Sequence, residues 1–176
     1  MKNQINFWNT IPFPDFLAPV SDPHHPEIRF LRGDDIEAIV ALEVAQLTEH
    51  AIPFDTAKIR LVVRELVAST NSGFVLVAES EREVVGFAYA ACLLSMERGS
   101  PSGSLEELYV VPDWRNQGVG GALLAAAIAH ARELRWPALE LEVVRGHERA
   151  AALYLRAGFR PNNRTRYSLD LSSPAA

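Results

Sequence analysis

The spacing of apolar and polar positions divides the first half of the chain into short strands and two helices. Apolar runs at residues 28–31, 74–79 and 84–94 predict β-strands, because runs of this length bounded by turn residues are typical of strands. Residues 35–50 and 56–70 carry apolar side chains at helical spacing, and an aspartate at the start of each segment suits an N-cap. The predicted order is therefore strand, helix, helix, strand, strand.

The second half predicts a strand–helix–strand unit, a further helix and a closing strand. A β-branched run at 105–111 leads into a helix at 118–135, and an alternating segment at 138–144 follows Pro137. Two strands joined through a helix run parallel, with a right-handed crossover. We also expect a loop at 96–104, a helix at 148–156 ended by Gly158, and a strand at 166–171.

The composition favours one globular domain. The chain has 176 residues, 48% of them hydrophobic, and its longest apolar helical run is too short to span a bilayer. The N-terminal residues do not follow the signal-peptide pattern, so we expect a cytoplasmic protein with no membrane partner. The net charge of −5 disfavours a nucleic-acid partner and favours a cationic substrate. Cys92, the single cysteine, lies in an apolar run and is expected to pack rather than react.

Residues 1–27 differ from the rest of the chain because prolines and aromatic residues alternate there. Repeated prolines disfavour a helix or a central strand, so this segment predicts an extended arm on the domain or on a partner subunit. The arm makes a homodimer conceivable. His24 and His25 have no third ligand nearby, so we expect a loop pair and no metal. Residues 172–176 form a tail.

The stretch from Tyr109 to Leu124 carries the strongest chemical signal. A strand, a Pro-Asp turn and a glycine cluster precede an alanine- and leucine-rich helix. The first amides of a helix have no partner within it, and glycines let a phosphate approach them, so Gln117 to Gly121 predict a phosphate or pyrophosphate site. A glycine-rich helix start without a ligand is one alternative. A nucleotide is another, although the P-loop lysine and the later glycine of the dinucleotide fingerprint are absent.

Two motifs in the expected order resemble the GNAT superfamily of acyl-CoA-dependent N-acetyltransferases. The first is Arg115-x-x-Gly118-x-Gly120, between an apolar strand and a long helix. The second is Ala150-x-x-Leu153-Tyr154-x-x-x-Gly158-Phe159, after an apolar strand. The resemblance covers residues 28–171 and implies a single α/β (α+β mixed) domain. Its twisted central sheet would be mixed and mostly antiparallel, with the parallel unit of residues 105–144 and helices on both faces.

The resemblance implies an enzyme that transfers an acetyl group from acetyl-CoA to a primary amine of a small molecule or peptide, by direct attack in a ternary complex and without a metal. The backbone N–H of Val110 would bind the acyl carbonyl oxygen, and the pantetheine arm would pair with Tyr109 to Val111 like an added strand. His147 stands where the family often has an asparagine. The coenzyme-binding residues implied are Leu108, Tyr109, Val110, Val111, Arg115, Asn116, Gln117, Gly118, Val119, Gly120, Gly121, His147 and Tyr154.

Tyr154 is the implied general acid. A tyrosine with its ordinary pKa near ~10 can protonate a leaving thiolate whose conjugate thiol has a pKa near ~8.5. A core aromatic residue is the alternative. The candidate bases are Glu107 and Glu142, which the sequence does not separate, with Glu106 and Glu140 as further carboxylates. Alternation would place Glu106 and Glu107 on opposite faces of their strand, and any of these carboxylates could be merely solvated.

The acceptor pocket is implied near the loop at residues 49–55. Thr48, Glu49, His50 and Phe54 are the candidate contacts, and a surface loop with Phe54 packed down is the alternative. A cationic amine acceptor fits the acidic charge. The competing function, from another class, is a non-catalytic domain that binds or senses acyl-CoA.

Overall fold

The computed structural model describes residues 25–144 and 146–171. The chain falls into two compact units, Met1–Glu142 and Val143–Ala176, and each is described by itself. Most of the predicted arm, including His24, and the tail at residues 172–176 lie outside the described residues.

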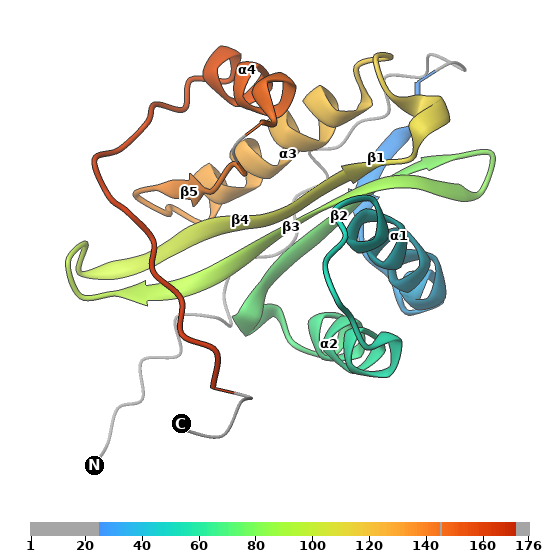
Figure 1. The fold of residues 1–176 in the computed structure, drawn as a ribbon, viewed down its shortest axis with the longest axis horizontal. Coiled ribbons are helices and arrows are strands. Elements are labelled where there is room, and N and C mark those ends of the chain that lie inside the picture. The colour runs from blue at the N-terminus through green and yellow to red at the C-terminus, as the bar shows by residue number, and fades with distance from the viewer. Residues whose placement is uncertain (1–24, 145, 172–176) are drawn as a thin grey trace. The chain divides into compact units, whose positions relative to one another are not determined.

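A five-stranded sheet forms the centre of the first unit, in the order β1-β2-β3-β4-β5. All neighbouring strands are antiparallel except β4 and β5, which are parallel as predicted (Figure 1). The sheet is therefore mixed and mostly antiparallel. The strands are β1 (Glu27–Phe30), β2 (Gly73–Ser80), β3 (Glu83–Ser95), β4 (Ser100–Val110) and β5 (Leu139–Leu141).

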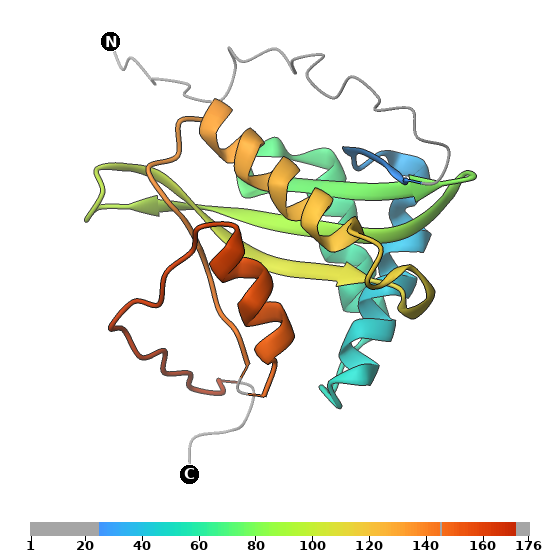
Figure 2. The same cartoon turned by 90° about the horizontal axis from the view of Figure 1, so that it is seen from above.

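Helices cover both faces of this sheet, which confirms the expected layering. The helices α1 (Ile36–Glu49) and α2 (Thr56–Ala68) lie on one face, and α3 (Val119–Glu133) lies on the other (Figures 1 and 2). Short 3-10 helices occupy Gly33–Asp35, Thr70–Ser72 and Pro112–Trp114. The second unit contains α4 (Glu148–Arg156).

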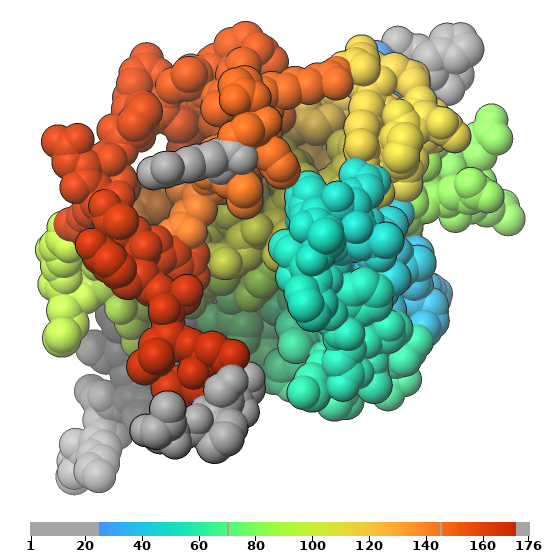
Figure 3. All heavy atoms as spheres, viewed as in Figure 1, coloured from blue at the N-terminus to red at the C-terminus, as the bar shows by residue number. Residues whose placement is uncertain are grey.

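Apolar packing joins each helix layer to the sheet. Ile39 and Val40 of α1 are buried with Val77 and Phe87 of the sheet. On the opposite face, Leu123 of α3 is fully buried at 0% exposure. Burying a side chain of this size stabilises the fold by roughly 1.5–3 kcal/mol before entropy is counted. In the space-filling view, α1 and α2 form one continuous ridge, blue to teal, beside the recessed strands (Figure 3).

Strand β4 contains a β-bulge halfway along its length, and beyond it the side chains that faced one side of the sheet face the other. Tyr89 of β3 pairs with Glu107, and the next residue of β3 pairs with Leu105, so Glu106 is an extra residue in a β-bulge. Pairing with β5 also ends here, at Leu105 and Leu141. Gly103 faces the Trp136 ring, whereas Tyr109 belongs to the core under α1 and α2. Strict alternation would put these two residues on one face, so the bulge has switched the faces.

Three expected elements differ in the structure. The strand expected at 138–144 is shorter, because β5 ends at Leu141, where its pairing with β4 stops. Only residues 96–99 form the turn where a loop at 96–104 was expected, because β4 already starts at Ser100. Pro101 has no N–H to donate to a second neighbouring strand. It is tolerated because β4 pairs only with β3 at this position, and the pairing with β5 begins at Gly103.

The strand expected at residues 166–171 is absent, and this segment is irregular. Tyr167, Leu169 and Leu171 are 89%, 81% and 84% exposed. Alternation produces a strand only where a neighbouring strand supplies hydrogen bonds, and no strand is assigned among residues 146–171.

A close approach at Gly103 gives a stability test of the β4–β5 junction. A Cβ on Gly103 would lie 2.4 Å from Trp136 Cε3 and 2.7 Å from Leu139 Cδ1. Gly103→Ala should therefore lower the free energy of unfolding by roughly 1–3 kcal/mol in urea denaturation, the usual cost of overpacking.

Gly33→Ala is the matched control, because a Cβ there has no atom within 4 Å. Its free energy of unfolding should stay within about 0.5 kcal/mol of the parent value. Equal denaturation midpoints for the two variants would show that Trp136 does not pack on Gly103 as described.

Candidate active site

The loop before α3 has the geometry of an anion site. Gly118 is the N-cap residue of α3, with φ at 87°, and no side chain caps the helix there. The first helical hydrogen bond on this loop joins the Ala122 amide to the Gly118 carbonyl at 2.9 Å. The amides of Val119 to Gly121 therefore have no acceptor within the helix, and the helix dipole favours an anion beside them.

His25 lies beside this loop, which the sequence did not indicate. Its Nε2 atom is 3.6 Å from the position that a Cβ on Gly118 would take. Gln117 fixes the loop from the other end, because its Nε2 donates to the Asp113 carbonyl at 2.6 Å.

Arg115 joins the glycine loop to the end of α1. Its guanidinium donates to both carboxylate oxygens of Glu49, at 2.9 and 2.8 Å, and its Nε donates to the Val110 carbonyl at 2.7 Å. The Tyr109 hydroxyl also donates to Glu49, at 2.7 Å, and the Arg115 Cζ atom lies 5.2 Å from the Tyr109 ring centroid. Partial burial of Glu49 is outweighed by these hydrogen bonds, so its pKa is lowered. The structure thus brings together Glu49, Tyr109 and Arg115, which the sequence assigned separately to the acceptor and the coenzyme.

The amide of Val110 points away from β3. The next amide, of Val111, donates to the Val85 carbonyl of β3 at 3.0 Å. Amides alternate between the two sides of an antiparallel strand, so the Val110 N–H faces the side on which β5 lies. The pairing with β5 has already ended at Leu105. This geometry supports the donor role predicted for Val110.

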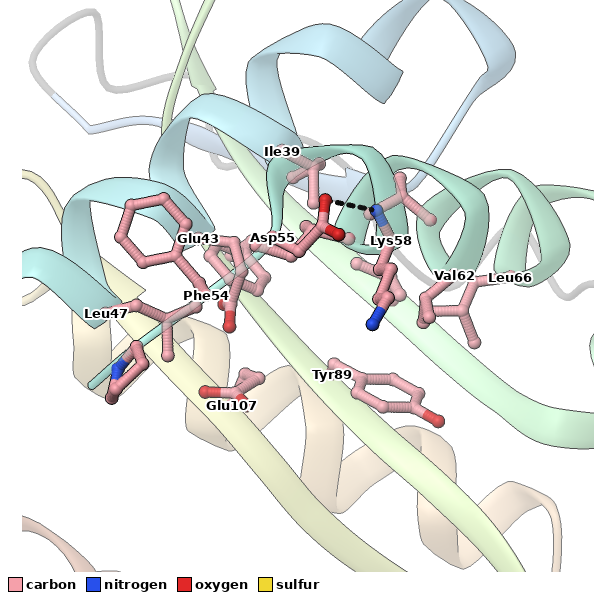
Figure 4. Close-up of a pocket in the computed structure, with 15 residues that line it drawn as sticks. Ile39, Glu43, Leu47, Phe54, Asp55, Lys58, Val62, Leu66, Tyr89 and Glu107 are labelled. Carbon is pink, nitrogen blue, oxygen red and sulfur yellow. Dashed lines mark hydrogen bonds between the residues drawn. The ribbon is translucent and has the colours of Figure 1, made fainter. Parts of the chain in front are cut away.

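A cavity of about 370 Å³ lies between α1, α2 and the sheet (Figure 4). Its volume falls within the range of roughly 300–1,000 Å³ that is usual for small-molecule sites. Phe54, one of the predicted acceptor contacts, lines it together with Pro53 and Asp55 of the same loop. Thr48, Glu49 and His50 do not line this cavity.

Glu107 projects into this cavity from β4 (Figure 4). Burial and the nearby negative charge of Glu43 raise the pKa of Glu107 to about 7. A hydrogen bond from the Gln46 side chain of α1 to Glu107 Oε2 opposes this shift. A carboxylate that titrates near neutral pH can take up and release a proton under physiological conditions.

Glu43 is a site residue that our sequence reasoning missed. It lines the cavity from α1, and burial raises its pKa. Among the described residues, no hydrogen-bond partner reaches its buried Oε2 atom. The signal was available in the sequence, because Glu43 stands four residues from both Ile39 and Leu47 on the apolar stripe of the helix. An acidic residue on a buried stripe is costly unless it is paired or functional.

The structure separates the carboxylates that the sequence left equivalent. Glu142 is exposed and follows the end of β5. Glu140 is also exposed, and its Oε1 accepts a hydrogen bond from Arg98 at 2.6 Å. Glu106 is exposed in the bulge. Glu107 alone among these four combines partial burial with a raised pKa.

Tyr154 lies on α4 in the second unit, where the helix end fixes its surroundings. The Gly158 amide donates to the Leu155 carbonyl at 3.1 Å, and the Phe159 amide donates to the Tyr154 carbonyl at 3.0 Å. This is a Schellman motif, and Gly158 supplies its left-handed residue with φ at 101°. The rings of Tyr154 and Phe159 meet edge to face, with centroids 5.9 Å apart. His147 occupies the N-cap position of α4.

Within residues 25–144 and 146–171, no three metal-binding side chains gather, and no helix has the length and apolarity needed to cross a membrane. Burial raises the pKa of the Cys92 thiol, which disfavours the thiolate form that a nucleophile requires.

Comparison with known sequences identifies relatives among acetyltransferases. A mycothiol acetyltransferase from Propionibacterium freudenreichii is 34% identical over 144 residues, which cover 78% of this chain and 45% of that protein. An uncharacterized N-acetyltransferase from Archaeoglobus fulgidus is 35% identical over 136 residues, which cover 73% of this chain and 88% of that protein. The chain thus spans about half the length of the mycothiol acetyltransferases it matches.

Solved structures show the same fold. An aminoglycoside N-acetyltransferase in complex with CoA aligns with a TM-score of 0.72 and 19% identity, covering 84% of this chain and 95% of that one. A possible acetyltransferase from Clostridium difficile aligns with a TM-score of 0.75 and 19% identity, covering 84% and 98%. The model of the acetyltransferase (GNAT) family matches residues 36–159, which include both motifs and every strand from β2 to β5. The resemblance seen in the sequence is therefore confirmed, and the chain belongs to the acetyltransferase (GNAT) family.

Proposed function

We propose that this protein transfers an acetyl group from acetyl-CoA to a primary amine by direct attack in a ternary complex. The observation that carries the proposal is Glu107, a carboxylate with a pKa of about 7 that lines a cavity large enough for an acceptor. The uncapped start of α3 supports a coenzyme site on the same unit. A non-catalytic acyl-CoA-binding domain would have no use for a buried carboxylate that titrates near neutral pH.

The proposed chemistry assigns one proton transfer to each end of the reaction. Glu107, directly or through water, takes a proton from the acceptor ammonium, and the freed nitrogen lone pair attacks the thioester carbonyl carbon. The Val110 amide binds the carbonyl oxygen while negative charge develops on it. The carbon–sulfur bond then breaks, and Tyr154 protonates the leaving thiolate. The nitrogen loses its second proton, which restores the Tyr154 hydroxyl through water, and Glu107 releases the first proton to solvent. The products are an N-acetyl amide, free CoA thiol and one released proton.

The coenzyme would lie along β4 and the start of α3. Its diphosphate would accept hydrogen bonds from the amides of Val119 to Gly121, and its pantetheine arm would pair with Tyr109 to Val111 where β5 no longer does. The Arg115 side chain is held by Glu49 and Val110, so we expect Arg115 to shape the loop rather than grip the phosphates directly. Gln117 and Asn116 complete the loop. His147 and Tyr154 of the second unit remain proposed contacts.

The anion site can be tested by placing a charge at Gln117. Gln117→Glu should raise the Kd for acetyl-CoA about tenfold at low salt, because a carboxylate would stand near the diphosphate. The difference should shrink at high ionic strength, where the repulsion is screened. Isothermal titration calorimetry measures both constants.

Gln117→Met is the control, because it removes the same hydrogen bond to the Asp113 carbonyl without adding charge. Loss of this bond should raise the Kd less than Gln117→Glu does, and by a factor that does not change with salt concentration. Equal losses in the two variants would place the diphosphate elsewhere.

The role of Glu107 predicts a pH effect. The parent enzyme needs the Glu107 carboxylate, so kcat/KM should rise as pH passes through about 7, the pKa of this group. Glu107→Gln should lower kcat/KM about 100-fold at pH 8 and remove that ascending limb, while the limb from the acceptor amine remains.

A control variant and a melting-temperature measurement test whether Glu107 is the base. Glu106→Gln, which changes the exposed neighbour in the bulge, should keep both the ascending limb of the pH–rate profile and most of the activity.

The raised pKa of Glu107 also predicts an effect on stability. In the folded protein this pKa is about 7, above its usual value of 4.5, so the contribution of Glu107 to stability is lost as the pH rises through this range. Glu107→Gln should therefore melt at a higher temperature than the parent at pH 8 but not at pH 4.5. A limb that survives in Glu107→Gln would assign the base to another group.

Tyr154→Phe tests the general acid. The variant keeps the ring that meets Phe159 but loses the hydroxyl, so kcat should fall about 10- to 100-fold while the Kd for acetyl-CoA stays unchanged. Tyr167→Phe is the control, because this tyrosine is 89% exposed in the same unit. Release of free thiol from acetyl-CoA measures both variants. Parent-like turnover in Tyr154→Phe would remove this residue from the mechanism.

A further inference from the structure

The walls of the cavity beneath α1 and α2 are mainly apolar. Ile39 and Leu47 of α1, Val62 and Leu66 of α2, Phe54 of the connecting loop and Phe87 of β3 all line it. Phe54 and Val62 are 42% and 56% exposed, so they present apolar surface that a ligand could cover. A pocket of this kind gains binding free energy by burying apolar groups.

The charged groups of the cavity are mostly acidic. Glu43, Glu107 and Asp55 contribute carboxyl groups, and Lys58 contributes an ammonium. The Asp55 carboxylate is occupied as the N-cap of α2, because it accepts hydrogen bonds from the Ala57 and Lys58 amides at 2.9 and 3.3 Å. Glu43 and Glu107 form a pair on neighbouring walls, and the Lys58 ammonium lies apart from them, on the side of Tyr89 (Figure 4).

This acidic pair lacks a donor on one side. Glu43 Oε2 is buried, and none of the described residues donates to it. An ammonium group brings three N–H donors and one positive charge, which match an unpaired carboxylate oxygen beside a second carboxyl group. Figure 4 shows Val62 and Leu66 toward the other end of the cavity, whereas Leu47 and Phe54 lie at the same end as Glu43.

We propose that the acceptor is a primary amine carried on an apolar body, such as an alkyl or arylalkyl group, rather than a polyhydroxylated aminosugar. The proposal rests on the acetyl transfer proposed above and names its acceptor class. The ammonium would lie between Glu43 and Glu107, and the apolar body would extend from there toward Val62 and Leu66. Sugar hydroxyls buried against these walls would lose their hydrogen bonds to water without gaining new ones.

A homologous series of acceptors tests this class. Propylamine, pentylamine and heptylamine have nearly the same amine basicity, so differences in kcat/KM report the burial of their chains. We expect kcat/KM to rise about fourfold per added methylene, the factor that burial of one such group provides. Phenylethylamine should also be acetylated, whereas glucosamine and the aminoglycoside tobramycin should react at least about 100-fold more slowly than heptylamine, because their hydroxyls lose partners.

Matched variants on α2 locate the apolar body. Val62→Thr keeps the shape of a cavity-lining residue and adds a hydroxyl, so kcat/KM for heptylamine should fall at least threefold, roughly the effect of one lost methylene contact, with little change for propylamine. Val67→Thr is the control, because Val67 is exposed on the same helix and does not line the cavity. Glu43→Gln should weaken binding of every amine in the series without changing its dependence on chain length.

A binding measurement separates failure of this inference from failure of the proposed transfer. Heptylamine should raise the melting temperature more than propylamine does, and heptanoate should not raise it, whether or not acetylation occurs. Transfer to aminosugars in preference to alkylamines would overturn the acceptor class and leave the transferase standing. Chain-length-dependent binding of amines without thiol release would overturn the transferase and leave the pocket assignment standing. Absence of any chain-length dependence in both binding and rate would overturn the inference itself.

Discussion

The β-bulge in β4, which reverses the faces of the side chains that follow it, is the constraint on which the candidate site depends. The bulge at Glu106 turns Glu107 and Tyr109 toward α1 and α2, whereas Gly103, before the bulge, faces Trp136. Pairing with β5 ends at the same point, so β4 beyond Leu105 keeps only β3 as a partner. The strand thereby presents the Glu107 carboxyl group to the cavity beneath α1 and α2, and backbone groups to the edge on which β5 lies. The bulge itself costs little, because it leaves only one residue outside the ladder.

The cavity places Glu107 where burial works against its charge. Burial raises the pKa of both Glu43 and Glu107, and the neighbouring charge of Glu43 adds to the rise of the Glu107 pKa to about 7. A protein selected only for stability would fill this space with apolar side chains, which often stabilise a core better than buried charges do. The cost is understandable if the same carboxylates receive an ammonium and accept its proton. Stability and function therefore oppose each other at this position.

Periodicity and turn residues predicted nearly every element, because those signals are local. The parallel unit around α3 followed from the strand at 105–111, the glycine-rich start and Pro137. The bulge did not follow, because Glu106 and Glu107 look like an ordinary alternating pair and the extra residue exists only relative to β3. Glu43 was missed although it stands on the apolar stripe with Ile39 and Leu47, because the stripe does not show that Glu107 of β4 lies in the same cavity. The strand expected at 166–171 failed because alternation cannot supply a pairing partner.

Glu49, Tyr109 and Arg115 form one set of contacts, although the sequence placed Glu49 with the acceptor and the other two with the coenzyme. An ion pair between side chains that are 36% and 37% exposed contributes only about 0–1 kcal/mol, so stability alone does not account for the arrangement. Its effect is geometric. Arg115 bonds the end of α1 and the carbonyl of Val110 together, while Tyr109 bonds Glu49 from the core side. The helix that carries Glu43 and Gln46 is thus tied to the strand that carries Glu107 and to the loop that precedes α3. The proposed acceptor wall, the proposed base and the proposed coenzyme loop are therefore held together by one set of hydrogen bonds.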